Sequence, residues 1–319
     1  MALAQPALPI PRRPSSLRRI GDSLGALRRS KTALTGAILV LFWVVVALFA
    51  DDLILRPDVL VSNPGCWLKA ECAITPVLAR YDPQQSFRGQ GLKGPSAEHW
   101  LGTDRQGRDL WSRMAHGARI ILVLAPASVL AALLVGGSLG LIAGYFGGLI
   151  DEVVMRFLDA MMAFPQILLY LVIIAALGPS AINIVLAIVI AGAPGIARLV
   201  RSLTLDIKTR DYIAAAQTRG ESPWYIMFVE ILPNARGPII IDAMLRVGYA
   251  VFAIGTLGFL GLGLPPPSPD WGSIVNSGRK FIQAGHIWDA MWASLATASL
   301  VVGLNLLADG LQEELNRYR

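Results

Sequence analysis

Side chains that could act as metal ligands or nucleophiles are few in this 319-residue sequence. There are three histidines, His99, His116 and His286, and two cysteines, Cys66 and Cys72. Their spacing matches neither the HExxH nor the CxxC pattern of zinc sites. The sequence also lacks a GxxxxGK(S/T) phosphate loop, so the chain is not expected to hydrolyse ATP. We therefore predict no catalytic residue, no metal site and no bound cofactor, with a membrane enzyme kept as an alternative.

Ionisable residues inside apolar segments could instead line an ion pathway. The candidates are Arg156 with Asp159, Asp242 with Arg246, and Asp289. The two pairs stand three and four residues apart, which is the spacing of neutralising ion pairs on a helix. We interpret them as structural pairs near a membrane face. The alternative is the ion pathway of a channel or secondary transporter.

The composition is that of a membrane protein. Hydrophobic residues make up 54% of the chain and charged residues 16%, and the mean hydropathy is +0.55. Soluble domains carry roughly 25% charged residues, so this chain has too few charges to cover a soluble surface. The net charge of +6 resides in residues 1–32, which hold seven basic residues and the single acid Asp22.

Six apolar runs approach or exceed the roughly 20 residues that a bilayer-spanning helix needs. They cover about residues 33–50, 120–145, 153–177, 181–199, 239–262 and 287–307. The sequence therefore predicts an all-α polytopic membrane protein with six transmembrane helices. The basic flank of the first run also fits a cleaved signal peptide, but the length of the run favours a retained helix.

The positive-inside rule places the basic arm, and with it both termini, in the cytoplasm. The expected organisation is a cytoplasmic arm at 1–32, a first transmembrane helix at 33–50, an extracytoplasmic segment at 51–118, a core transmembrane domain at 119–310 and a cytoplasmic tail at 311–319. Within the core, the loop 200–237 is expected inside and the proline-rich loop 264–286 outside.

The arm and the external segment carry two further patterns. Four aliphatic residues of the arm recur at helical spacing: Leu17, Ile20, Leu24 and Leu27. They predict an amphipathic helix held on the membrane surface by lipid, the alternative being a disordered basic tail. The arm has no interleaved aromatic residues, so we expect no nucleic-acid binding. Outside the membrane, Cys66 and Cys72 would form a disulfide or stay unpaired thiols.

Four glycines at four-residue spacing share one face of the second apolar run: Gly136, Gly140, Gly144 and Gly148. Small residues in this register let helices approach closely in lipid. We predict a helix-packing surface there.

The internal loop begins with the pattern of a short helix. Asp211 is an expected N-cap for a helix over 212–219, and Gly220 is an expected terminator at the position after its end.

A second helix is expected to follow directly. Ser222 would cap it, Pro223 would occupy its first position, and Leu232-Pro233 would end it. The residues alone fit a docking element and a mere connector equally well.

This loop resembles the EAA motif of ABC importer permeases, in which a Glu-Ala-Ala triplet precedes a glycine and a later Leu-Pro. Here the triplet is Ala214-Ala215-Ala216, so the glutamate is absent, and Gly220 and Leu232-Pro233 follow. Other stretches resemble the C-type permease of the peptide/nickel subfamily: WLGTDRQGRDLWSRMAHGARI (100–120), YFGGLIDEVVMRFLDAMMAFP (145–165), ILPNA (231–235) and LGFLGLGLPPPSPDWGSIVNSGR (257–279). The resemblance covers about residues 100–310.

The resemblance implies a non-catalytic permease subunit with the type I ABC importer fold in a bacterial inner membrane. The implied partners are a homologous B-type permease, two ABC ATPases that bind ATP and Mg, and an extracytoplasmic substrate-binding protein. Peptides or peptide-like solutes are the implied cargo, with nickel or another small solute as the alternative. Nine residues are implied to couple the chain to an ATPase: Asp211, Tyr212, Ala214, Ala215, Gly220, Ser222, Pro223, Leu232 and Pro233.

Overall fold

The structure is a computed structural model that describes residues 30–50 and 78–317. Two predictions lie outside these residues: the amphipathic helix of the arm, and the disulfide between Cys66 and Cys72. Across the described residues the fold is helical, and the only β-type pairings there are two isolated bridges.

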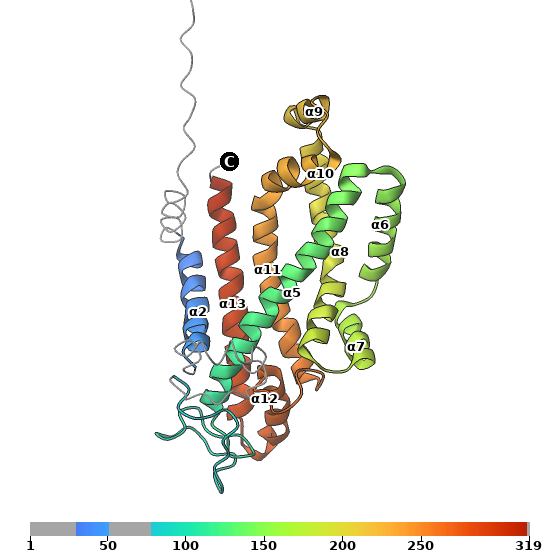
Figure 1. Ribbon diagram of the computed structural model, residues 1–319. Helices are drawn as coiled ribbons and strands as arrows, with labels where there is room; N and C mark the ends of the chain where they lie inside the picture. The colour runs from blue at the N-terminus through green and yellow to red at the C-terminus, as the bar shows by residue number, and fades with distance from the viewer. Residues whose placement is uncertain (1–29, 51–77, 318–319) are drawn as a thin grey trace, which may run out of the picture.

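Five described helices are long and apolar enough to cross a membrane. They contain α2 (Lys31–Leu48), α5 (Leu110–Phe146), α8 (Ala181–Lys208), α11 (Leu232–Phe259) and α13 (Trp288–Arg317). Figure 1 shows them running lengthwise through the molecule, with the ends of α8 and α11 near α9 (Asp211–Thr218). The predicted all-α membrane fold is thus confirmed over the described residues.

The prediction of one continuous helix over 153–177 is wrong. Two helices, α6 (Gly148–Met162) and α7 (Gln166–Leu177), replace it and are bent by 88° at the break. Pro165 stands at the break in an extended conformation with ψ 127°. A proline lacks the N–H for a helical bond and disfavours helix in the residue before it. If α6 and α7 count as one broken span, the described chain has six spans.

α5 packs along α8 at the centre of the molecule. A Cβ atom at Gly136 would overlap the carbonyl oxygen of Ala193, and one at Gly140 would overlap that of Ala197. Gly144 lies against Thr204 in the same way. Only glycine permits backbones to approach this closely, so these residues form a helix-packing seam.

Gly148 does not belong to this seam. It is the first residue of α6, with φ +56°, and a Cβ atom there would have no neighbour within 4 Å. α5 ends before it, at Phe146, because Gly147 adopts φ +67°. The four-residue spacing of glycines therefore continues past the end of α5, and Gly148 does not share the packing face of the other three.

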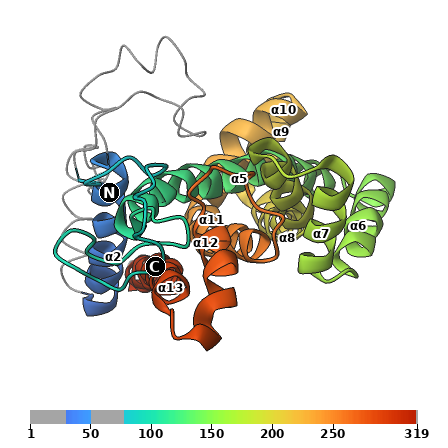
Figure 2. The same cartoon turned by 90° about the horizontal axis from the view of Figure 1, so that it is seen from below.

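The other helices cover the two sides of this pair. Figure 2 shows α2 and α13 on one side of the molecule and α6 and α7 on the opposite side. Gly36 of α2 lies against the backbone of α13, and the Trp43 indole Nε1 donates a hydrogen bond to Ser299 Oγ at 2.8 Å. α12 (Trp271–Gly278) packs between α11 and α13 at the end opposite α9, which we call the loop end.

Alanine substitutions at two neighbouring glycines of α5 test the seam. Gly140→Ala is expected to destabilise the fold by about 1–3 kcal/mol, because its Cβ meets an α8 carbonyl that cannot move aside. Gly137→Ala is the matched control: its Cβ meets nothing within 4 Å, and alanine improves helix propensity by up to about 1 kcal/mol. Thermal unfolding of the purified protein in detergent measures both. Equal loss in the two variants would contradict the packing assignment.

Candidate functional site

α9 projects beyond the ends of α8 and α11 at one end of the molecule (Figure 1). Its C-terminus closes as a Schellman motif. The Gly220 N–H donates to Gln217 O at 2.9 Å, and the Glu221 N–H donates to Ala216 O at 3.2 Å. Gly220 has φ +76°, the left-handed conformation that this motif requires. The structure thus places Gly220 at the predicted terminating position.

The N-terminus of α9 differs from the prediction that Asp211 caps it. The cap is Arg210, which makes no side-chain capping hydrogen bond, and Asp211 is the first residue inside the helix. A carboxylate in the first turn still interacts favourably with the positive end of the helix dipole. The role of Asp211 is therefore electrostatic, and the backbone N–H groups of the first turn do not depend on its side chain.

α10 (Pro223–Tyr225) begins as predicted by local rules, with Ser222 Oγ accepting a hydrogen bond from the Tyr225 N–H at 3.2 Å and Pro223 in the first turn. The prediction that Leu232-Pro233 ends the second helix is wrong. Helical structure continues into α11 through one π-helical stretch, η2 (Ile226–Ile231). There the Leu232 N–H bonds to Met227 O, five residues back. The π-helical turn directly precedes α11, and Pro233 stands in the first turn of that helix, where a missing N–H costs least.

The surface of this α9–α10 element, residues 211–231, is mixed in character. Ile213 and Ala216 are buried and anchor α9, whereas Tyr212, Ala214 and Ala215 are exposed. Four large apolar side chains of the second segment are also exposed: Trp224, Tyr225, Phe228 and Val229. The Trp224 and Phe228 rings stack, with centroids 6.3 Å apart. An apolar patch on an exposed protrusion is typical of a protein-docking surface.

Three of the exposed aromatic residues, Trp224, Tyr225 and Phe228, were not among the predicted coupling residues. Their signal was present in the sequence, because Trp224 and Phe228 stand four residues apart and therefore share a helix face. Arg219 also lies 3.6 Å from a Glu221 carboxylate oxygen and 3.9 Å from a Glu230 oxygen. The contact with Glu230 connects the end of α9 to η2.

Of the two ion pairs predicted inside the spans, one forms and the other does not. Arg246 Nε and Asp242 Oδ2 are 2.5 Å apart, as the spacing predicted. Arg156 does not pair with Asp159: Arg156 binds Glu152, and Asp159 binds Arg198 of α8.

Arg156 pairs within α6 at the i,i+4 spacing, whereas Asp159 reaches across to α8. α6 is joined to α8 a second time by Arg201 and Asp151, whose contacts measure 2.5 Å.

Arg246 also bridges helices. Its Nη1 donates weakly to Gly192 O of α8 at 3.5 Å, and its guanidinium covers Gly195. A cavity of about 60 Å³ beside it is lined by the polar residues Gln166, Tyr170 and Tyr249, among others. The Asp242–Arg246 pair is therefore a structural connection between α11 and α8.

At the loop end, two of the three histidines, His99 and His116, make hydrogen bonds that hold the structure together. His99 is buried, with Nδ1 2.9 Å from Asp109 Oδ1 and Nε2 3.0 Å from Gln90 Oε1. The other Asp109 oxygen accepts from Ser112 N and Oγ at 2.8 and 2.7 Å and caps α5. His116 Nδ1 lies 2.8 Å from Ser112 O. Among the described residues, no group of three or more metal-ligating side chains is close enough to hold an ion.

Asp270 and Trp271 hold the proline-rich loop against the helices. Asp270 caps α12 by accepting from the Gly272 and Ser273 N–H groups at 3.2 and 3.1 Å. Its burial raises the pKa of the Asp270 carboxyl to about 6 against the opposing effect of those hydrogen bonds. The fully buried Trp271 donates from Nε1 to Met114 O of α5 at 2.9 Å. These hydrogen bonds fasten the start of α12 to α5.

Sequence comparison places this architecture among transport proteins. Residues 136–318 match the family described as "Binding-protein-dependent transport system inner membrane component". A dipeptide transport system permease protein of Alkalihalophilus pseudofirmus is 37% identical over 295 residues, which cover 92% of this chain and 88% of the relative. A glutathione transport system permease protein of Pectobacterium atrosepticum is 41% identical over 241 residues, covering 75% of this chain and 79% of the relative.

A solved structure of the MetNI methionine ABC transporter in inward-facing conformations is also similar. It is 18% identical and covers 62% of this chain and 96% of that chain, with a TM-score of 0.47.

Asp270→Asn tests the electrostatics of the loop end. Asparagine keeps a capping oxygen but cannot ionise. The pKa of folded Asp270 lies above the ordinary 3.8, so protonation favours folding: the stabilising effect is full below about pH 4 and is lost as pH rises through 6. From this group we expect the native protein to lose about 3 kcal/mol between these limits, and the variant to lose correspondingly less. Denaturation followed by tryptophan fluorescence measures this, and identical pH profiles would contradict it.

Proposed function

The chain belongs to the binding-protein-dependent transport system inner membrane component family, and we propose that it forms one half of the translocation pathway of an ATP-driven importer of peptides or peptide-like solutes. The observation that carries this proposal is the 37% identity to a dipeptide transport permease over nearly the whole of both chains. A second relative is named for glutathione, which is itself peptide-like. Peptide chemistry is thus common to both names.

The α9–α10 element is the proposed contact with a partner ATPase. It projects from the helices, carries exposed apolar side chains, and has local hydrogen bonds at the end of α9 and the start of α10, so we expect it to move as a rigid body. Within it, Tyr212, Ala214 and Ala215 supply exposed surface. Asp211 lies in the first turn of α9, at the positive end of the helix dipole. The remaining predicted coupling residues shape the backbone: Gly220, Ser222, Pro223, Leu232 and Pro233.

One continuous helix connects the proposed ATPase contact to the proposed translocation pathway. Residues 223–259 run without interruption from α10 through η2 into α11. A displacement of the α9–α10 element by closure of ATP-bound ATPases would therefore move α11 directly. ATP and Mg belong to those partner subunits, because this chain carries no phosphate-binding loop.

The α9 end is the proposed cytoplasmic side. Figure 1 shows the start of α2 and the end of α13 at this same end, which places both described chain ends together. Six basic residues flank it: Arg198, Arg201, Lys208, Arg210, Arg219 and Arg236. Their position follows the positive-inside rule. The loop end, with α12 and residues 78–109, then faces the substrate-binding protein and closes the pathway on the outside.

A series at Gly220 tests coupling. A Cβ atom there would have open space, so the left-handed backbone alone decides which residue is tolerated. Gly220→Val is expected to lower transport relative to ATP hydrolysis about 5- to 30-fold, since a β-branched residue resists this conformation by about 1–2 kcal/mol. Gly220→Asn is the control, because asparagine adopts the left-handed conformation readily. Both rates are measured in proteoliposomes; normal transport by the valine variant would contradict the rigid-element mechanism.

Copurification tests the assembly. The tagged chain is extracted from its native membrane in mild detergent, and its companions are identified by mass spectrometry. We expect a second permease of the same family and one or two P-loop ATPases. A homo-oligomer without an ATPase would overturn the importer assignment in favour of a channel or secondary transporter.

A further inference from the structure

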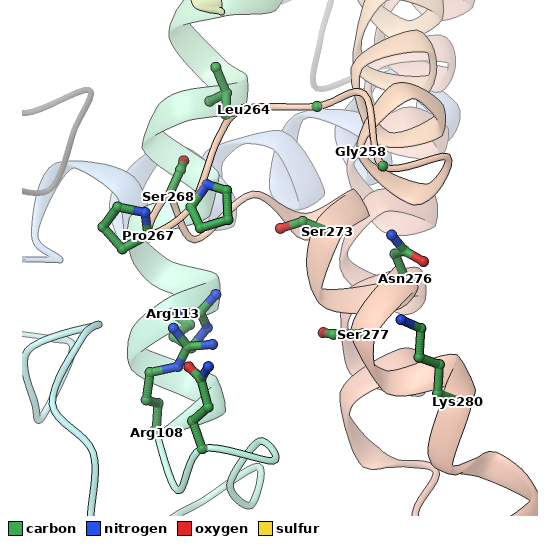
Figure 3. A pocket seen from close by; sticks show the side chains of 14 residues that line it. Arg108, Arg113, Gly258, Leu264, Pro267, Ser268, Ser273, Asn276, Ser277 and Lys280 are labelled. Carbon is green, nitrogen blue, oxygen red and sulfur yellow. The ribbon is translucent and has the colours of Figure 1, made fainter. Parts of the chain in front are cut away.

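A cavity of about 320 Å³ opens at the loop end between α5, α12 and the proline-rich loop (Figure 3). Its basic lining residues are Arg108, Arg113 and Lys280. Three buried aspartates interact with Arg113 and balance the three positive charges: Asp104, Asp270 and Asp289. The walls of this cavity therefore have no excess charge that would select a ligand. A second cavity, among the membrane-spanning helices, has donors that remain free to bind.

This second cavity has a volume of about 60 Å³ and lies where α5, α7, α8 and α11 meet. Its lining residue Val129 lies near the middle of α5, and Gly192 lies near the middle of α8. A buried water needs about 10–15 Å³, whereas a whole small-molecule site takes about 300 to 1,000 Å³. The cavity can therefore hold one polar group of a larger ligand.

Tyr170 of α7 contributes an unpaired hydroxyl to the wall of this cavity. The residue is 9% exposed, and no hydrogen bond among the described residues uses its hydroxyl. The hydroxyl oxygen is not one of the unpaired side-chain atoms that are sealed from solvent, so it keeps accessible surface. Most buried hydroxyls in proteins are paired. An unpaired hydroxyl beside a cavity therefore favours a partner that does not belong to the chain.

Arg246 of α11 adds donors whose charge is already balanced. Its Nε lies 2.5 Å from Asp242 Oδ2, and its Nη1 has only a long contact, 3.5 Å, with Gly192 O. Its Nη2 lies close to Gly195 and donates to no group within the described part of the chain. A guanidinium carries five N–H groups, so several remain for a ligand. Because Asp242 neutralises the positive charge, the site suits a neutral acceptor better than an anion.

The break between α6 and α7 adds backbone donors at the edge of the cavity. α7 begins at Gln166, which lines the cavity, and its N-cap, Pro165, makes no side-chain capping hydrogen bond. The first N–H groups of a helix have no partner within that helix, and in a membrane they need one from protein or water. The site is thus rich in donors: a phenol, a guanidinium and the start of a helix.

The open side of the cavity borders polar surface. Tyr249, which lines the cavity, is 66% exposed. On α8, Arg198 lies one turn beyond Gly195, and it pairs with Asp159 while both side chains stay more than half exposed. Exposed charges are costly against lipid and occur where membrane helices line water. We therefore expect this face to border the aqueous pathway of the proposed importer.

We propose that this cavity binds a backbone carbonyl of the transported peptide, with the Tyr170 hydroxyl and the Arg246 guanidinium as donors. The inference rests on the proposed importer function. A peptide carbonyl is a neutral acceptor that every peptide presents, whatever its side chains. The site would therefore hold a peptide during its passage without selecting its sequence. The rest of the peptide would lie on the exposed side of the cavity, beside Tyr249.

Modification of a cysteine at the mouth of the cavity tests the proposal. The complete importer, purified without its binding protein, carries Tyr249→Cys together with Cys66→Ser and Cys72→Ser. A charged methanethiosulfonate reagent modifies a thiol that is in water and spares one that is in lipid. We expect the thiol at position 249 to react. The control is Leu41→Cys, at a residue of α2 that is 59% exposed and lies on the side of the molecule opposite α6 and α7; it should stay unmodified.

Protection by peptides then identifies the bound group. At about ten times its Kd, alanyl-alanine should slow the modification at position 249 about tenfold. Its analogue with sulfur in place of the peptide carbonyl oxygen is a poorer acceptor, so we expect about fivefold weaker binding and only about threefold protection at the same concentration. Tyr170→Phe should lower the protection by alanyl-alanine to about threefold and remove the difference between the two peptides. Tyr145→Phe is the matched control, because Tyr145 is also 9% exposed but lies outside the cavity.

The contrary results have distinct meanings. An unreactive thiol at position 249 would place this face against lipid or protein and overturn the site. A thiol that reacts but is not protected, in an importer whose wild-type form transports alanyl-alanine once binding protein is added, would overturn the site and leave the importer function standing. Equal protection by the peptide and its sulfur analogue would overturn carbonyl recognition. Protection in a complex that imports no peptide would overturn the proposed function and leave a peptide-binding cavity.

Discussion

The close approach of α5 and α8 is the contact on which the rest of the molecule depends. Gly136 and Gly140 present bare backbone to the carbonyls of Ala193 and Ala197, so the two helices pack without intervening side chains. In lipid, burying apolar surface gains little, and close van der Waals packing of this kind supplies the association. α8 leads to α9 at one end, and α5 starts at the buried Asp109 cluster at the other. The seam therefore joins both functional ends.

Different interactions hold the α9 end and the loop end together. At the α9 end, hydrogen bonds local to the chain close the C-terminus of α9, and large apolar side chains are exposed. At the loop end, ionisable groups such as His99 and Asp270 are buried and hydrogen-bonded, while Arg113 and Ser268 each keep an unpaired polar atom. Charges interact more strongly away from water, and burial raises the pKa of Asp270 to about 6, so we expect the stability of the loop end to depend on pH. The exposed end is suited to mechanical contact.

Local rules predicted those features that depend on neighbouring residues alone. The apolar runs became helices because backbone polar groups in lipid must be paired within the chain. Gly220, Ser222 and Pro223 took their expected positions because caps and left-handed turns involve only a few residues. The same rules failed at Pro233, where the helix continues after a π-helical stretch. They also failed at the continuous span expected over 153–177, which breaks before Pro165.

The sequence by itself determined the helical membrane architecture, most span positions and the helix–glycine–helix form of the loop, because these follow from hydropathy and from interactions close along the chain. Only the tertiary structure decided which side chains meet across elements. It joined Asp159 to Arg198 in place of Arg156, excluded Gly148 from the packing seam, and brought Arg113 and Ser268 to one cavity. Such contacts depend on the angles and separations of packed helices, which local sequence patterns do not encode.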